Sequence, residues 1–300
     1  MKVLITGGSG MLGRKITEML LLEGNEVAWL SRSNQTKNSE ISTYHWDPNK
    51  HSVDQTAIDW ADAIINLAGE SIGETKWNTK GKASILSSRI NSVKTLVEAL
   101  KKRKVPLKSF VGVSGSGYYG PSKAAKAETD LAGSDFPAKV ATAWELAYAQ
   151  ISDEMSEKKC IIRLAVVLSL EGGALPKLIN PIQFGLGAAL GSGLQAFSWI
   201  HIDDAAKIFI SGLGWDGIFN TAATEKINNA QATKLIAKAM HRPYFLPAIP
   251  EFVLQLFLGE RSQLVTQGTV LNTQKLKETN YQFLYPGFEK AIANLLIIKA

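Results

Sequence analysis

The stretch KVLITGGSGMLGRKI, residues 2–16, decides the fold of this chain. Residues 2–6 form a short, mostly apolar run that predicts a buried strand, and the amphipathic pattern of residues 11–22 predicts a helix. Four glycines stand between and within them: Gly7, Gly8, Gly10 and Gly13. Glycine permits a tight turn, lets the backbone approach a ligand closely and lets a helix pack near a strand. The stretch therefore predicts a strand, a glycine turn and a helix in immediate succession.

A strand, a glycine turn and a helix in this order are the context of a dinucleotide-binding fingerprint. The amides at the start of such a helix have no partner within the helix and can bind phosphate groups. We predict that the cofactor contacts the turn and the first helical residues: Gly7, Gly10, Met11, Leu12 and Gly13. Three residues that end another predicted strand are expected beneath the riboses: Leu67, Ala68 and Gly69.

The tip of the second predicted strand favours NADP over NAD. It reads Ser31, Arg32 and Ser33, and no acidic residue follows until Glu40. An NAD site usually has a carboxylate here for the ribose 2′-hydroxyl, whereas a 2′-phosphate needs cations and hydroxyl groups. We therefore assign these three residues to the 2′-phosphate, with Arg14 or Lys37 as additional candidates. The alternative is that Arg32 is a solvated loop residue.

Apolar strand candidates alternate with helical patterns through the first two thirds of the chain. The predicted strands are 2–6, 26–31, 63–67, 109–114 and 159–164, and the predicted crossover helices are 11–22, 80–102 and 136–155. Buried apolar strands joined by helices are typical of parallel sheets. We predict an α/β fold, a Rossmann-type doubly wound parallel sheet with a smaller C-terminal substrate lobe.

The sequence changes character after Leu170, where the glycine-rich stretch 172–193 is too long for an ordinary connection and predicts a binding segment. We predict an NAD(P)-binding Rossmann domain at 1–170 that also receives 201–240. A substrate-loop segment at 171–200 and a small C-terminal domain at 241–300 complete the division. Within the returning part we expect a helix over 203–213, capped by Asp203, and a strand over 218–221. A last helix is expected to reach Ile298.

Composition argues against several functional classes. The 33 basic and 27 acidic residues leave a charge of +6, but no basic face with interleaved aromatics predicts a nucleic-acid partner. No apolar run reaches the roughly 20 residues that a membrane span requires. The single cysteine, Cys160, and an N-terminus that begins directly in a strand favour a reducing, cytoplasmic setting. Four scattered histidines predict no metal site. We expect a small-molecule substrate and leave a homodimer open.

Several motifs resemble the extended short-chain dehydrogenase/reductase superfamily: TGGSGMLG, INLAG, VSGSGYYG and FSWIHIDDAAKIF occur in that order. Further motifs are similar to an atypical branch of nucleoside-diphosphate-sugar epimerases or dehydratases: NLAGESI, SRI, GYYG, WE, GGALPKL, GLGAALGSGLQAFSWIHIDD, HRP and LGE. That branch ends in a small domain of unknown function, and the resemblance covers essentially the whole chain. It implies a fold and an NAD(P) cofactor better than it implies a reaction.

The resemblance also implies a catalytic tyrosine with a lysine one helical turn later, but this chain lacks that pair. Only Tyr119 and Lys123 have the spacing of four, and the residues between them, GPS, predict a turn in place of a helix. Counting back from Glu145 puts the expected tyrosine near Pro137 and the expected lysine near Ala141. Neither side chain can transfer a proton.

The remaining catalytic candidates are Ser114, Tyr118, Tyr119 and Arg89. The resemblance implies that Ser114 orients a substrate and that Arg89 stands where relatives carry asparagine. Arginine is no acid at neutral pH, but its guanidinium can clamp a phosphate or carboxylate; the alternative is a structural ion pair. Either tyrosine could replace the missing acid, or pack at the pocket wall.

Other polar and aromatic residues have two interpretations each. Glu70 and Lys76 either line the pocket mouth or are surface charges, and Trp77 and Trp199 either stack on a ligand or fill the core. Three more residues are candidates for contacting ligand hydroxyls: Gln195, Ser198 and Asn220.

Two functions fit this sequence. The first is an NADP(H)-binding oxidoreductase or epimerase that acts on an anionic or nucleotide-sugar-type substrate without the usual pair. The second is a catalytically inactive, NADP(H)-responsive regulatory or scaffold protein.

Overall fold

The computed structural model describes residues 1–33 and 41–297, so Lys37, Glu40 and Ile298 lie outside the described residues. Among the described residues, one sheet has eight strands in the order β12-β8-β6-β5-β1-β2-β3-β4. The strands are β1 (Lys2–Thr6), β2 (Glu26–Ser31), β3 (Ser42–Asp47), β4 (Ser52–Val53), β5 (Ala63–Asn66), β6 (Ser109–Gly115), β8 (Lys159–Leu164) and β12 (Gly217–Thr221). Neighbouring strands are parallel except β3 and β4. The predicted α/β fold is confirmed.

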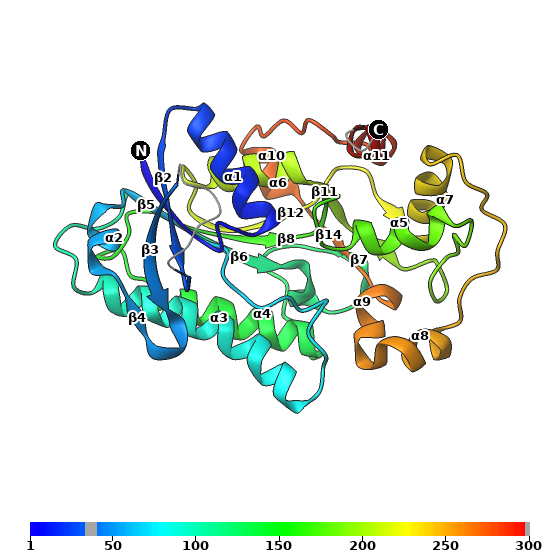
Figure 1. Cartoon of the computed structure of the whole chain (residues 1–300), viewed down its shortest axis with the longest axis horizontal. Helices are drawn as coiled ribbons and strands as arrows, with labels where there is room; N and C mark the ends of the chain where they lie inside the picture. Colours follow the sequence, from blue (N-terminus) through cyan, green and yellow to red (C-terminus); the bar gives the residue numbers. More distant parts are fainter. Residues whose placement is uncertain (34–40, 298–300) are drawn as a thin grey trace.

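Helices cover both faces of this sheet, as Figure 1 shows: α1 (Met11–Leu22) and α6 (Ile202–Gly212) on one face, α2 (Gln55–Trp60), α3 (Thr79–Leu100) and α4 (Phe136–Tyr148) on the other. Successive side chains of a strand point to opposite faces. In β1, Leu4 is buried under α3 and α4, whereas Val3 and Ile5 are buried under α1 and α6. Burial on both faces explains why these strands read as continuous apolar runs.

One predicted helix boundary was wrong, and several elements were not predicted. The edge strands β3 and β4 were not predicted because β3, STYHWD, is polar and buries only Trp46 and part of its other side chains. The helix predicted over 136–155 ends at Tyr148, where the backbone tightens into a turn through the bonds of Gln150 N to Ala147 O and Ile151 N to Tyr148 O. The glycine-rich stretch 172–193 contains a helix, α5 (Leu175–Gln183).

Beyond the large sheet, the C-terminal part of the chain forms β9 (Val166–Leu168), β10 (Ala196–Phe197), β11 (Trp199–His201), β13 (Ile227–Asn228), α7 (Asn229–Ala239), α8 (Glu251–Leu258), α9 (Gln263–Thr266), β14 (Thr269–Leu271), α10 (Gln274–Glu278) and α11 (Phe288–Ile297). Leu276 of α10 packs into the core that α1 and α6 share. A third core holds side chains of α5, β9, β11, β13, α7 and α11. Trp199 and Phe288 meet edge to face in this core. The strand β14 pairs in parallel with β7 (Ser122–Lys126), so segments predicted to belong to separate units share a sheet. The predicted division into units stays a prediction.

Two side chains at the start of α6 tie the C-terminal segment to the sheet. The fully buried carboxylate of Asp204 accepts hydrogen bonds from Leu284 N at 2.7 Å and Tyr285 N at 2.9 Å. His201 caps α6, because its Nδ1 accepts from Asp203 N at 3.1 Å. The prediction that Asp203 caps this helix was therefore wrong: Asp203 lies in the first turn, and its carboxylate pairs with Lys15.

This cap makes the stability of the fold depend on pH. Burial lowers the pKa of His201 below its ordinary value of 6.5. As the pH falls, this histidine is therefore protonated in the unfolded chain before it is protonated in the folded chain. The contribution of neutral His201 to the free energy of unfolding is complete above about pH 6.5 and decreases as the pH drops below that value. Asparagine keeps a cap acceptor but does not titrate. We expect urea unfolding at several pH values to show a smaller loss of stability on acidification in His201→Asn than in the unchanged protein. Equal losses in the two proteins would contradict this assignment.

Candidate cofactor and substrate site

The glycine turn places the start of α1 against the end of β1. Gly7 has a φ of +69°, and a Cβ on Gly13 would lie 2.4 Å from the Gly7 carbonyl oxygen, which no side chain tolerates. A Cβ on Gly8 would lie 2.4 Å from the Trp29 ring. Gly10, the N-cap residue of α1, has no side chain to accept from the first-turn amides. Those amides can bind an anion at the carboxyl edge of the sheet.

Thr6 holds the end of β5 beside this turn. Its hydroxyl donates to Asn66 Oδ1 at 2.5 Å and accepts from the amides of Leu67 and Ala68 at 3.1 Å each. A Cβ on Gly7 would lie 3.2 Å from the Leu67 backbone, so the turn and this strand end are in close contact. The two segments predicted to contact the cofactor, at residues 7–13 and 67–69, are thus brought together.

The tip of β2 lies at the same edge of the sheet. Ser31 is half-buried, Arg32 is exposed, and Ser33 N donates to Ser31 Oγ at 3.2 Å. Arg14, an additional candidate for the 2′-phosphate, instead pairs with Glu171 at 2.6 Å and donates to Ser9 O. Of the described cations that the sequence assigned to the 2′-phosphate, Arg32 is therefore the one at this tip.

Arg89 lies beneath the end of β5 and is nine-tenths buried. Its Nη1 donates to Glu70 O at 2.8 Å and to Ile85 O at 2.9 Å, and its guanidinium lies 4.8 Å from the Trp144 ring. Burial lowers the pKa of Arg89 to about 10, so it is still charged at neutral pH. Its hydrogen-bond partners are backbone carbonyls, so the structural ion pair considered for Arg89 is absent among the described residues.

Glu70, whose backbone carbonyl accepts from Arg89, also forms hydrogen bonds through its carboxylate. Its carboxylate accepts hydrogen bonds from the hydroxyls of Ser84 and Thr75, which lower the pKa of Glu70, and the charges of Arg89 and Arg32 lower it further.

Trp77 is buried against Phe136, and Trp199 is buried in the third core, so both tryptophans fill core space. Of the two interpretations given for Trp77 and Trp199, the structure supports packing in the core.

Ser114 belongs to a buried hydrogen-bond network at the end of β6. Its hydroxyl donates to Glu145 Oε1 at 2.6 Å, and Glu145 forms two hydrogen bonds with Arg163, at 2.9 and 2.7 Å. Ser114 is only 3% exposed. Burial alone would lower the pKa of Arg163, but the hydrogen bonds and charge of Glu145 outweigh it and raise that pKa. Sequence reasoning named Glu145 only as a motif residue and missed Arg163.

Arg163 also joins the two candidate tyrosines. The guanidinium lies 3.5 Å from the centre of the Tyr118 ring and donates to the Tyr119 hydroxyl at 2.7 Å. Tyr119 is 4% exposed, donates its own proton to Asn220 Oδ1 at 2.7 Å, and has a pKa that burial raises. Tyr118 is half-buried, and its hydroxyl has no hydrogen-bond partner among the described residues.

The structure explains why the spacing of Tyr119 and Lys123 is misleading. Tyr119 ends the short 3-10 helix η2 (Ser116–Tyr119), and Lys123 lies in β7, so no helix joins them. This confirms the predicted turn. Pro137 lies in the first turn of α4, where a Cβ on Gly117 would come within 3.0 Å of its Cβ. Pro137, the position reached by counting back from Glu145, therefore lies against the turn after β6.

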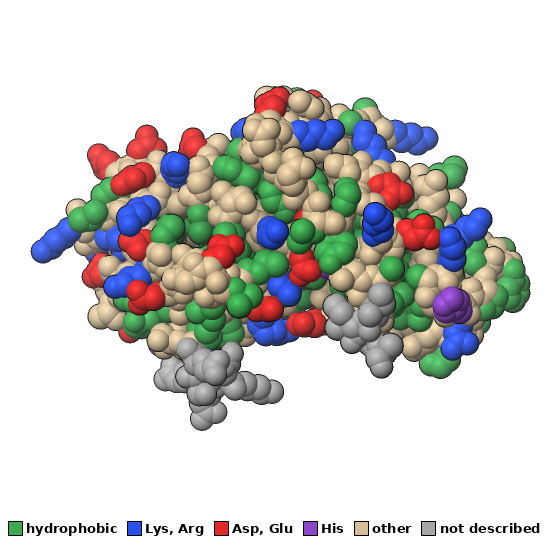
Figure 2. Space-filling model, turned by 90° about the horizontal axis from the view of Figure 1, so that it is seen from above, with side chains coloured by type: hydrophobic (Ala, Val, Ile, Leu, Met, Phe, Trp, Pro, Cys, Tyr) green, Lys and Arg blue, Asp and Glu red, His purple; other side chains and the backbone are tan. Residues whose placement is uncertain are grey.

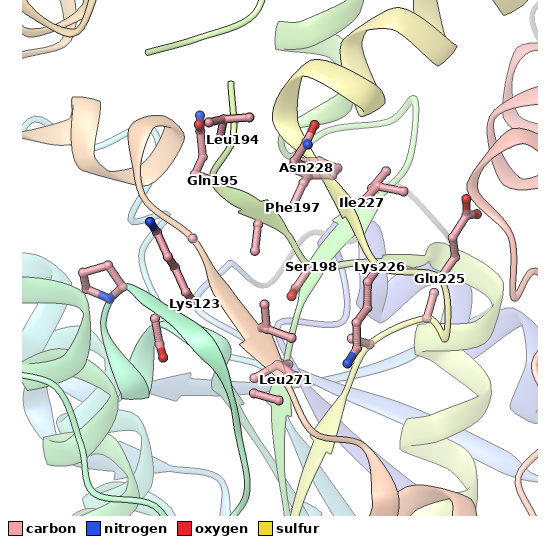
Figure 3. A pocket seen from close by; sticks show the side chains of 18 of the residues that line it. Lys123, Leu194, Gln195, Phe197, Ser198, Glu225, Lys226, Ile227, Asn228 and Leu271 are labelled. Carbon is pink, nitrogen blue, oxygen red and sulfur yellow. The ribbon is translucent and has the colours of Figure 1, made fainter. Parts of the chain in front are cut away.

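A cavity of about 1000 Å³ opens beside these tyrosines, between the β7–β14 pair and the β10–β13 pair. Figure 3 shows Lys123 on one wall and Lys226 on the other, with Ser198 and Leu271 between them. Ala222 and Leu271, which line the cavity, also pack against Tyr119. Its charged lining residues are Lys123, Glu225, Lys226 and Lys277.

The electrostatic balance of this cavity favours an anion. Three of its four charged lining residues are lysines, and the Glu225 carboxylate accepts a hydrogen bond from Phe288 N at 2.5 Å. Gln195 and Ser198 line the cavity, but their side chains donate to backbone oxygens, and Asn220 is buried beneath it. No local motif could have revealed the cavity, because its walls come from four separate parts of the chain.

On the face seen in Figure 2, basic and acidic side chains are interspersed. Within residues 1–33 and 41–297, no group of three or more His, Cys, Asp or Glu side chains could hold a metal ion. In the same residues, no helix combines the length and the apolar character needed to cross a membrane.

Comparison with known proteins agrees with this geometry. A model of the NAD dependent epimerase/dehydratase family matches residues 3–220, which include the glycine turn, Ser114 and α6. The chain belongs to this family. A second model, described as a domain of unknown function (DUF1731), matches residues 249–295.

Relatives match along the whole epimerase-family chain. Epimerase family protein YfhF of Bacillus subtilis is 34% identical over 99% of this chain and 98% of its own length. Human epimerase family protein SDR39U1 is 32% identical over 99% of this chain and all of its own length. The crystal structure of human SDR39U1 isoform 2 with NADPH has a TM-score of 0.88 at 31% identity, covering 98% of this chain and 99% of that one. The resemblance inferred from the motifs is confirmed.

The network around Arg163 is expected to stabilise this epimerase-family fold. Removing one partner of a buried ion pair leaves the other charge without compensation and typically costs about 3 kcal/mol or more. We therefore expect Arg163→Met to lower the free energy of unfolding by about 3 kcal/mol, measured by urea titration. The exposed Arg32→Ala serves as the matched control and should change it by less than about 0.5 kcal/mol. If the two variants unfold alike, Arg163 does not hold this region together.

Proposed function

We propose that this protein binds NADP(H) on the glycine turn and uses it to transform a small anionic substrate bearing hydroxyl or carbonyl groups. The observation that carries the proposal is the contact between the glycine turn and the Thr6-held end of β5, which forms a cofactor platform at the carboxyl edge of the sheet. Ligands of doubly wound sheets bind at this edge, near the point where the strand order reverses, here between β1 and β5.

The cofactor is assigned as NADP(H) on two grounds. The first is the tip of β2, where an arginine and two serines stand and no carboxylate does. The second is the human relative of the same family, whose crystal structure contains NADPH. In this assignment the amides of the glycine turn hold the pyrophosphate, Met11 and Leu12 begin the helix beneath it, and residues 67–69 lie under the riboses. Bound NADP(H) supplies or accepts a hydride.

Tyr118 is the proposed proton donor. Of the four catalytic candidates, three have polar groups committed within the fold: Ser114 to Glu145, Tyr119 to Asn220 and Arg163, and Arg89 to two carbonyls. Arg89 is no acid at neutral pH, so the Tyr118 hydroxyl is the candidate acid without a hydrogen-bond partner among these described side chains, and Arg163 fixes the Tyr118 ring by lying against its face. Arg163, Glu145 and Ser114 act as positioning residues.

The substrate is proposed to enter the cavity between β7–β14 and β10–β13. Lysines on both walls suit a phosphate or carboxylate, and a cavity of about 1000 Å³ can hold a nucleotide-linked sugar or a smaller organic acid. Arg89 is proposed to position the Glu70 backbone beside the cofactor, since its Nη1 donates to the Glu70 carbonyl. A cytoplasmic location is proposed on the single buried cysteine.

A second function is favoured by one observation. Counting back from Glu145 puts the acid near Pro137 and its lysine partner near Ala141, neither of which can transfer a proton, and Ser114 and Tyr119 are buried and bonded within the fold. A regulatory or scaffold protein could keep the cofactor platform while losing turnover. It predicts a protein partner whose affinity changes with NADPH. Pull-downs with and without NADPH test this, and identical recoveries would remove its support.

Cofactor choice is tested at the tip of β2. Arg32→Ala removes the proposed cation from the 2′-phosphate, and loss of a charge-assisted contact should raise the Kd for NADPH by about tenfold to a hundredfold. The Kd for NADH should change by less than about twofold, because NADH has no 2′-phosphate. Fluorescence titration of both cofactors measures this, with Arg14→Ala as the control. An unchanged preference in Arg32→Ala would contradict the NADP(H) assignment.

The proton donor is tested with two neighbouring tyrosines. Tyr118→Phe should lower kcat by about a hundredfold or more while leaving NADPH affinity unchanged, since only the acid is lost. Tyr119→Phe should instead lower the free energy of unfolding by about 1–3 kcal/mol, because it leaves the buried Asn220 and Arg163 groups without a partner. Turnover is measured by NADPH oxidation with a panel of carbonyl compounds and sugar nucleotides. Full activity in Tyr118→Phe would refute its role.

A further inference from the structure

A short segment, residues 171–177, connects the two parts of the chain that form the proposed cofactor platform. At its start, Glu171 pairs with Arg14 of α1 at 2.6 Å. Near the start of α5, Lys177 pairs at 3.5 Å with Glu74, which lies in the loop between β5 and α3. One pair thus lies just beyond the glycine turn, and the other lies just beyond the end of β5. We call residues 171–177 the strap.

The middle of the strap lies beside the first turn of α1. Cβ atoms added to Gly172 and Gly173 would each lie 3.9 Å from the side chain of Met11, the first residue of α1. Met11 and Leu170, the residue before the strap, pack against the same third core. The amides in this first turn are the proposed pyrophosphate contacts. The strap therefore leaves the edge of the phosphate-binding turn and crosses toward the loop after β5.

The loop that receives the strap is also fixed to the C-terminal part of the chain. Arg261, in the short helix η3 (Gly259–Ser262), donates to the carbonyl oxygens of Gly73 at 3.4 Å and Glu74 at 3.0 Å. Lys177 Nζ donates to the Gly73 carbonyl oxygen at 3.4 Å. Among the described residues, a Cβ on Gly73 would meet no atom within 4 Å beyond its chain neighbours. Polar contacts therefore hold the tip of this loop.

The ion pairs that fasten the strap are weak enough to open. Their four side chains are between 49% and 66% exposed. Exposed ion pairs contribute little to stability and are screened by salt. Between the two pairs, Gly173 has a φ of +75°, and the adjacent Gly172 has no side chain either. Glycine changes its backbone dihedral angles at low cost, so the strap can detach at one end while the sheet stays folded.

We propose that the strap closes over the bound cofactor and controls how fast the cofactor enters and leaves. This inference rests on the proposed function, which places NADP(H) on residues 7–13 and 67–69. A dinucleotide on those residues passes beneath a segment that is fastened beyond both of them, at Arg14 and at Glu74. Association and release then both require one end of the strap to detach. The strap affects the rates of exchange more than the affinity.

Stopped-flow rates of NADPH binding and release test the strap, with variants that remove one acid from each pair. Glu171→Gln and Glu74→Gln should each raise both the association and the dissociation rate constants by about threefold. The double variant should raise both by about tenfold, so that the Kd stays within about threefold of its original value. The matched control is Glu289→Gln, which breaks the exposed Lys238–Glu289 pair and should leave both rate constants unchanged. All three acids are exposed, so the variants should fold, which their urea unfolding transitions verify.

Three results would overturn the strap. If the two acids only repel the anionic cofactor, their removal slows release and lowers the Kd. If they contact the cofactor directly, their removal speeds release, leaves association unchanged and raises the Kd. Unchanged rate constants in the double variant show that the segment does not control exchange. Any of these results in a protein that binds NADPH removes the strap alone, whereas an unchanged protein that binds no NADPH contradicts the proposed function and the strap with it.

Discussion

The contact between the Gly13 Cα and the Gly7 carbonyl oxygen constrains everything built at the carboxyl edge of this sheet. Because a Cβ on Gly13 would lie 2.4 Å from that oxygen, only glycine lets α1 begin so close to β1. The amides of the first turn of α1 then lie directly over the strand ends. Thr6, the last residue of β1, uses its hydroxyl to bring the end of β5 to the same place. A backbone contact thus builds the proposed phosphate-binding platform.

A second group of interactions brings the C-terminal segment, and with it one wall of the lysine-lined cavity, back to the sheet. Asp204 accepts from the backbone of Leu284 and Tyr285, and β14 pairs with β7, so the C-terminal segment returns to the sheet. Between the two regions lies Arg163, which bonds to Glu145 and Tyr119 and faces the Tyr118 ring. Ser114 and Tyr119 are therefore hydrogen-bonded within the fold, which is why Tyr118 is the proposed acid among the four candidates.

The fold, and the strand, glycine turn and helix at its start, could be predicted from sequence because both are encoded locally. The glycine turn spans seven residues and the strands are continuous apolar runs, so pattern and position agree. The edge strand Ser42–Asp47 was not predicted, because only Tyr44 and Trp46 alternate toward the core and the other four residues are polar. The cap at His201 was missed because the neighbouring aspartates are stronger caps by residue type.

The candidate site was harder to predict because it depends on contacts between distant residues. Ser114 and Glu145 are 31 residues apart, Tyr119 and Asn220 are 101 apart, and no spacing rule connects them. Arg89 illustrates the same difficulty: its chemistry suggested an anion clamp or an ion pair, whereas its Nη1 donates to two backbone carbonyls. Tertiary packing decides which side chains are available to a ligand.

The central claim is that the glycine turn and the end of β5 together hold the cofactor. Amide hydrogen exchange with and without saturating NADPH tests it most directly, because the backbone amides at residues 7–13 and 67–70 are the proposed contacts. We expect exchange at both segments to slow by about tenfold or more, while residues 251–258 of α8 are unaffected. Unchanged exchange at residues 7–13, or slowing confined to the lysine-lined cavity, would contradict it.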